Sequence, residues 1–173
     1  MNDMILLKQG EIVLKGQNRR AFEQRLIANI RRRLKPHGSF RVYAIQSTVY
    51  VEPEADADLD GAFDALKTVF GVVALSRAAA CEKSAEAIAA RAIEYLADDM
   101  RAAKSFKVET RRSDKAFPMT SIQLSQYVGG ELAEAFPDTA VDVHDPELTV
   151  HVEVRDLAAY VHSTPTPGAG GMP

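Results

Sequence analysis

The sequence of 173 residues predicts an α+β protein made of two small domains. Apolar residues recur at helical spacing in several segments and alternate at strand spacing in others, and the two kinds of segment follow each other along the chain. The composition, with 46% hydrophobic and 26% charged residues, is that of a globular chain. It excludes a mainly disordered or fibrous protein.

The first domain is predicted over residues 1–77. Phe22, Leu26, Ile30 and Leu34 recur every four positions, which predicts one apolar helix face. A second helix is expected to bury a face that ends at Phe70. The expected elements are a strand at 4–7, a helix at 18–34, paired strands at 40–45 and 48–52, a helix at 59–70 and a strand at 72–76. This order is the split βαβ pattern of a ferredoxin-like βαββαβ domain.

The second domain is predicted over residues 78–162. Its expected elements are a helix at 84–100, a strand at 105–110, a helix at 120–136 and strands at 140–143, 148–154 and 157–162. Thr120 and Gln123 form a capping box at the start of the helix at 120–136, and this helix is expected to bury Ile122. The last residues, 163–173, are rich in glycine and proline and are predicted to be a linker.

Charge is distributed unevenly along the chain. The net charge is −3, yet residues 1–45 carry ten Lys and Arg against three Asp and Glu. An oriented contact with nucleic acid requires such asymmetry, whereas a solvated helix face would account for it equally well.

The first group of candidate binding residues lies at the start of the first helix. Lys15 precedes a helix N-terminus, which favours anions. Arg19 and Arg20 lie in the first turn, where cations oppose the helix dipole unless a phosphate or an acid is nearby. These basic residues are also compatible with an ordinary turn that carries exposed charges and binds nothing. At the other end of the helix, the dipole alone accounts for the cations at 31–33 and 35.

The second group follows the strand at 105–110. Lys107, Arg111, Arg112 and Lys115 are candidates for phosphate contacts, and Phe117 is a candidate for stacking on an unpaired base. Phe117 is equally compatible with a place in the core.

The sequence contains no catalytic constellation. Four histidines lack metal-ligand spacing, and Cys81, the only cysteine, is expected to be a small buried thiol. No apolar run is long enough to span a membrane, and the first residues do not have the pattern of a secretory signal. These features predict a soluble protein of the cytoplasm with no membrane partner.

Three stretches resemble the tRNA 4-thiouridine sulfurtransferase (ThiI) family. Residues 10–20, GEIVLKGQNRR, resemble the N-terminal sequence of that family. Residues 106–118, FKVETRRSDKAFP, resemble the first signature of the RNA-binding THUMP module. The junction with the catalytic domain is similar to YVH at 160–162 followed by PGAGGMP at 167–173. The resemblance covers the whole chain in order.

The resemblance implies a ferredoxin-like domain, an α/β THUMP domain and a linker toward a PP-loop catalytic domain that this chain lacks. In the family, that domain uses ATP and magnesium to activate a uridine of tRNA, and a cysteine desulfurase supplies the sulfur. The family is also linked to thiamine thiazole synthesis, and its members are commonly dimers. This chain is accordingly expected to bind the tRNA acceptor end and to have no cofactor or catalysis of its own.

By matching positions, the resemblance implies RNA contacts at Lys15, Arg111, Arg112 and Lys115, with Phe117 secondary. Cationic loops of both domains are expected to converge on one face. Two other interpretations remain: the RNA-binding module of another tRNA-modifying enzyme, such as a methyltransferase, and a ferredoxin-like interaction domain without RNA.

Overall fold

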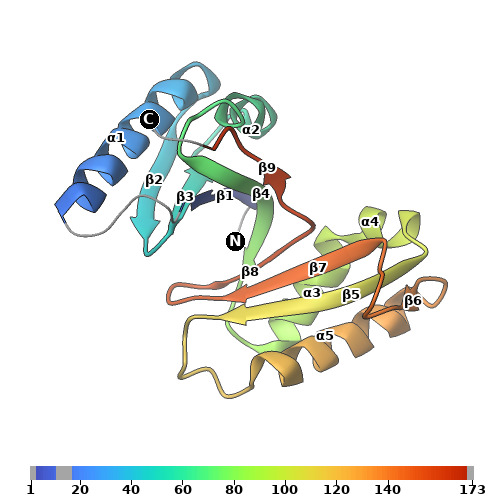
Figure 1. Cartoon of the computed structure of the whole chain (residues 1–173). Helices are drawn as coiled ribbons and strands as arrows, with labels where there is room; N and C mark the ends of the chain where they lie inside the picture. Colours follow the sequence, from blue (N-terminus) through green and yellow to red (C-terminus); the bar gives the residue numbers. More distant parts are fainter. Residues whose placement is uncertain (1–2, 11–16, 171–173) are drawn as a thin grey trace. The chain divides into compact units, whose positions relative to one another are not determined.

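The computed structural model describes residues 3–10 and 17–170, which form two compact units (Figure 1). Within the described ranges, the first unit contains residues 3–10, 17–77 and 165–170, and the second contains Ala78–Thr164. Strand β4, Val72–Cys81, contributes its first six residues to the first unit and its last four to the second.

The first unit is a ferredoxin-like domain. Its elements are β1 (Asp3–Gln9), α1 (Gln17–Leu34), the short 3-10 helix η2 (Lys35–His37), β2 (Phe40–Ile45), β3 (Thr48–Pro53), α2 (Leu59–Leu66) and the first part of β4. The strands lie in the order β2-β3-β1-β4, and β3 pairs antiparallel with both β1 and β2. This is the order expected of a split βαβ fold.

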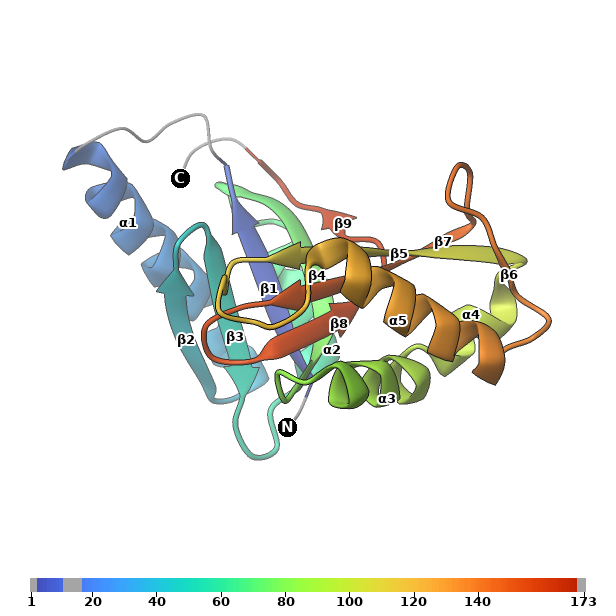
Figure 2. The ribbon, with the colours of Figure 1, turned by 90° about the horizontal axis from the view of Figure 1, so that it is seen from below.

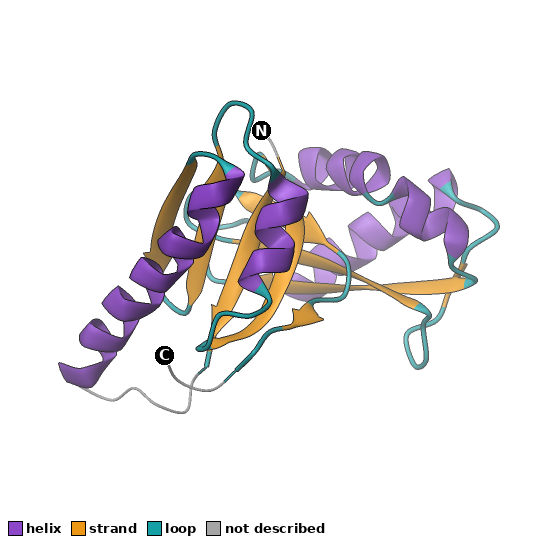
Figure 3. Ribbon diagram, turned by 90° about the horizontal axis from the view of Figure 1, so that it is seen from above, coloured by secondary structure: helices purple, strands orange, loops and turns teal. Residues whose placement is uncertain are grey.

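The core of this unit lies between the sheet and the two α-helices, α1 and α2. Figure 3 shows both helices over the same face of the sheet. Phe22, Leu26 and Ile30 of α1 are almost fully buried and pack with Ile5 and Leu7 of β1. The four-residue spacing therefore gave the correct buried face of α1, because side chains four apart lie on one side of a helix.

The expected burial of Phe70 is wrong. Helix α2 ends at Leu66, and its expected last turn forms an irregular segment instead. Val69 takes the buried position, whereas Phe70 is 60% exposed. Gly71 follows with a positive φ of 98° and turns the chain into β4.

Residues 166–170, within the segment predicted to be a linker, are bound to β4. Strand β9 (Thr166–Pro167) pairs antiparallel with β4, and the amides of Gly168 and Gly170 donate to the carbonyl oxygens of Val73 and Val72 at 3.0 and 2.8 Å. A Cβ at Gly168 would lie 2.2 Å from the Val72 oxygen. The glycine here permits close backbone approach, which composition alone does not distinguish from flexibility.

The second unit is an α/β domain. Its elements are the end of β4, α3 (Ala85–Tyr95), α4 (Ala97–Ala102), β5 (Ser105–Arg112), α5 (Ser121–Ala135), β6 (Ala140–Val141), β7 (Leu148–Val154) and β8 (Ala159–His162). The strands follow the order β4-β8-β7-β5-β6, with β5 parallel to β6 and β7. Helices α3 and α5 contact each other, and α5 also contacts β5 (Figure 2).

Two expectations about helices of the second unit are wrong. The helix predicted at 84–100 is divided into α3 and α4 at Leu96. The capping box of Thr120 and Gln123 is present, but Ile122 is 72% exposed. Helix α5 instead buries Leu124 and Val128, which lie four residues apart on its inward face.

Candidate nucleic-acid interface

The candidate residues of the second unit lie on β5 and in the loop from β5 to α5, residues 113–120. The amide of Ser113 donates to the Val154 carbonyl at 2.9 Å, which ties the start of the loop to β7. The capping box at Thr120 fixes its end. Between them Phe117, 6% exposed, packs in the hydrophobic core of the unit. Phe117 therefore anchors the loop, and its ring is not exposed for stacking on a base.

Arg112 shapes this loop from within. Its guanidinium donates to the carbonyl oxygen of Phe117 at 3.0 Å and to that of Lys115 at 3.4 Å. Asp114 accepts from Lys83 at 2.5 Å and from the amide of Ala116 at 3.0 Å. The Lys83 hydrogen bond, with the Ala116 amide second, lowers the pKa of the Asp114 carboxyl. These contacts hold the loop in one conformation.

Arg111, near the end of β5, and Lys115, in the loop, are the cations of this region that face solvent. Both side chains are exposed, and neither is paired with a carboxylate among residues 3–10 and 17–170. Lys107, by contrast, forms an ion pair with Glu109 at 2.8 Å, and this contact is the main cause of the lowered pKa of Glu109. Arg111 and Lys115 are therefore the cations of the group best placed to receive an anion.

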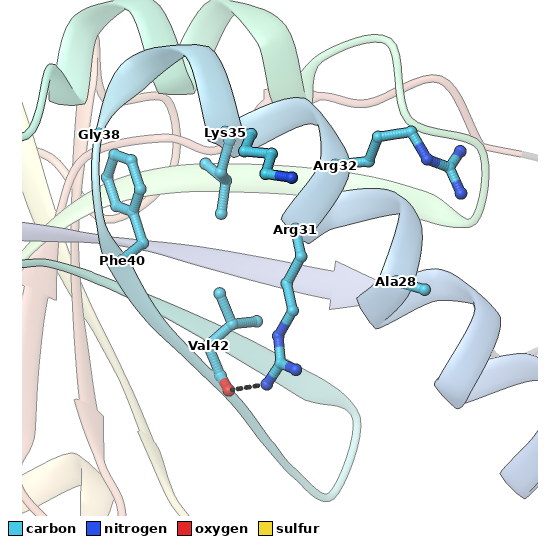
Figure 4. A pocket seen from close by; sticks show the side chains of 8 residues that line it. Ala28, Arg31, Arg32, Lys35, Gly38, Phe40 and Val42 are labelled. Carbon is cyan, nitrogen blue, oxygen red and sulfur yellow. Dashed lines mark hydrogen bonds between the residues drawn. The ribbon is translucent and has the colours of Figure 1, made fainter.

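The first helix presents a second set of cations. Arg19 and Arg20 are exposed near the start of α1, whose first turn contains no acidic residue. Lys15 lies outside the described residues, so the expected convergence of loops from both domains stays a prediction. At the end of α1, the sequence indicated only cations that complement the helix dipole, yet Arg31, Arg32 and Lys35 line a hollow (Figure 4).

The histidines and the cysteine have structural partners. Nε2 of His162 lies 2.7 Å from a carboxylate oxygen of Glu153, and the His162 ring stacks on His151 with centroids 5.0 Å apart. Burial, followed by the charge of His162, lowers the pKa of His151. Cys81 is buried, and desolvation raises its pKa to about 11. This confirms the expected buried thiol.

The described part of the chain contains no group of three or more His, Cys, Asp or Glu residues placed to hold a metal ion. Within the same residues, every helix is too short or too polar to cross a bilayer.

Comparison with known proteins matches two domain families in succession. The model of the ThiI ferredoxin-like domain matches residues 4–76, and that of the THUMP domain matches 82–163. A "Probable tRNA sulfurtransferase" of Alkaliphilus oremlandii is 40% identical over the whole chain, which spans 44% of that protein. The chain thus covers less than half the length of this relative.

Two solved structures share the fold over the full length of the chain. A 4-thiouridine synthetase, solved in complex with RNA and ATP, superimposes with a TM-score of 0.84 at 22% identity, and the chain covers 44% of it. A protein of Pyrococcus horikoshii gives a TM-score of 0.84 at 23% identity, with 57% of it covered.

The fold and these matches place the chain in the class of proteins that have a ferredoxin-like domain followed by a THUMP domain. The chain belongs to the ThiI family, of which it is the N-terminal ferredoxin-like and THUMP region.

Proposed function

We propose that this chain is the tRNA-binding region of a tRNA 4-thiouridine sulfurtransferase and that it positions the acceptor end of tRNA for a catalytic domain elsewhere in the full protein. The main support is a pair of exposed cations that form no ion pair within the described part of the chain: Arg111 near the end of β5, and Lys115 on the loop fixed by Arg112, Asp114 and Phe117. A loop that is already ordered loses little conformational entropy when it binds a phosphate backbone.

Phosphate neutralisation is expected to supply most of the affinity for RNA, because this fold does not imply a helix that recognises base sequence in a groove. Binding should therefore weaken steeply as salt is raised. Selectivity should come from RNA shape and from the unpaired 3′ end, since single-stranded nucleotides expose edges that paired bases hide.

The remaining parts of the reaction are proposed for the full protein. We place ATP, magnesium and the sulfur-transfer chemistry in the part beyond this chain, with a cysteine desulfurase as sulfur donor. The same assignment includes a contribution to thiamine thiazole synthesis, assembly as a homodimer and a cytoplasmic location.

The acceptor-end proposal is tested by comparing the affinity for intact tRNA with that for the same tRNA lacking its 3′-terminal nucleotides. Weaker binding of the truncated tRNA is the expected result. Equal affinities would contradict acceptor-end recognition while leaving general tRNA binding in place.

Two alternatives have distinct tests. A THUMP module attached to a methyltransferase would be revealed by the residues encoded after Pro173, although the matched relative named as a sulfurtransferase favours the first proposal. An interaction domain without RNA would fail to retain tRNA in a filter-binding assay at low salt.

A further inference from the structure

Two neighbouring hollows of the first unit lie along the C-terminal half of α1. The larger, about 450 Å³, is lined by Arg31, Arg32 and Lys35 together with Phe40 and Val42 (Figure 4). Its volume falls within the range of roughly 300 to 1,000 Å³ typical of ligand sites. The smaller hollow measures about 180 Å³ and is lined by Asn29, Arg32, Arg33, Thr68, Val69 and Phe70. Arg32 lines both, so the two hollows share one charged wall.

The positive charge of this wall is not neutralised. Neither hollow has an acidic residue in its lining, and Arg31, Arg32, Arg33 and Lys35 form no ion pair within the described ranges. Other cations of the same unit form ion pairs. Arg41 lies 3.8 Å from Glu52, Lys67 lies 2.9 Å from Asp64, and Arg77 pairs with Asp60.

Neutral partners orient the three guanidinium groups instead. Arg31 donates to the Val42 carbonyl at 3.3 Å, Arg32 donates to the side-chain oxygen of Asn29 at 3.1 Å, and Arg33 donates to the Thr68 hydroxyl. Such contacts fix the direction of a guanidinium while leaving its full charge and its other N–H donors available. A guanidinium held in this way suits a phosphate, which accepts two parallel hydrogen bonds.

Phe70 adds an aromatic surface to the smaller hollow. Phe70 is 60% exposed, whereas the neighbouring Val69 is 3% exposed. The helix dipole explains cations at the end of α1, but it does not explain an exposed ring beside Arg32 and Arg33. An aromatic ring next to arginines is the combination that binds an unpaired nucleotide, because the base stacks on the ring while the phosphate pairs with the cations.

We propose that these two hollows bind a single-stranded segment of RNA, with its phosphates on Arg31, Arg32, Arg33 and Lys35 and one base on Phe70. This inference rests on the proposed function of the chain as a tRNA-binding region. It adds a specific contact surface on the ferredoxin-like unit, separate from the β5–α5 loop.

The test measures binding of the 173-residue chain to tRNA, to a ten-nucleotide single-stranded RNA and to a blunt duplex of the same sequence. Arg32→Glu is expected to weaken binding of tRNA and of the single strand by roughly tenfold, through loss of a phosphate contact and added repulsion. Phe70→Ala should weaken single-strand binding by at least about fivefold. It should leave duplex binding unchanged, and Phe70→Tyr should retain the wild-type affinity.

The matched charge control is Arg101→Glu, an exposed position on α4 of the other unit. It makes the same change in net charge and should reduce affinity less than Arg32→Glu does. Equal effects of the two reversals, or an unchanged single-strand affinity of Phe70→Ala, would overturn the inference. If the wild-type chain binds no tRNA, the proposed function itself fails. If it binds tRNA but the Arg32 and Phe70 variants bind RNA as tightly as the wild type, the inference alone fails.

Discussion

Replacing both Arg111 and Lys115 by alanine should lower the salt dependence of tRNA binding. Each phosphate contact contributes roughly 0.7 to 0.9 to the slope of log K against log salt. Two lost contacts should therefore reduce the slope by about 1.4 to 1.8, and the affinity ratio of wild type to variant should shrink by roughly tenfold between about 50 and 200 mM salt. Stability should hardly change, because both side chains are exposed and neither is ion-paired within the described residues.

The assay is fluorescence anisotropy with labelled tRNA at five or more salt concentrations, with a thermal melt of each variant as the folding control. Lys107→Ala is the matched comparison within the same strand, because its charge is already paired with Glu109. Its slope should remain closer to that of the wild type. If the double variant and the wild type give parallel salt plots, Arg111 and Lys115 do not contact phosphates and the reasoning is refuted.

Three further predictions concern the second unit. Cys81 has a pKa raised to about 11, so alkylation at pH 8 should be roughly 100-fold slower than for an ordinary thiol and should become fast in urea; rapid labelling of the native chain would contradict this. His151 has a lowered pKa, so folding favours its neutral form; the free energy of unfolding should fall as pH drops through about 6.5, and His151→Asn should flatten that part of the profile. A His151→Asn profile with the wild-type slope would contradict the assignment of this pH dependence to His151. Thr120→Ala removes the capping box and should cost about 1 kcal/mol in urea unfolding, whereas an unchanged midpoint would show that the cap contributes nothing.

The long periodic elements were predictable from sequence because their burial repeats with the geometry of the element. Leu148 and Val150 alternate with Thr149 in β7, and that strand has the predicted bounds. The faces of α1 and the cap at Thr120 follow from equally local rules. Such rules act within one segment, so they hold without knowledge of the tertiary structure.

The differences arise where tertiary contacts decide. Phe70 continues the helical spacing of α2, but the chain leaves the helix at Leu66 and turns that ring outward. Gly168 belongs to a stretch with the composition of a linker, yet it hydrogen-bonds to β4, and its lack of a side chain permits that close approach. Spacing does not reveal either event.

The candidate site divides in the same way. The sequence indicated the basic β5–α5 loop, but Arg112 and Phe117 hold it together while Arg111 and Lys115 face solvent. The sequence identified these three basic residues and Phe117 as candidates without distinguishing those two roles. The hollows beside Arg32 were not predicted, because residue spacing does not show the space that a helix leaves beside its neighbours. The larger hollow is lined by residues 28–42, and the smaller combines residues 29–33 with 68–70.

The most direct test of tRNA binding by this chain places a photo-crosslinking amino acid at position 115 and maps the linked nucleotides of bound tRNA. Crosslinks concentrated in the 3′ acceptor strand, which competition with unlabelled tRNA removes, are the expected result. Crosslinks confined to the anticodon arm, or none above the level seen with the probe at position 101, would contradict it.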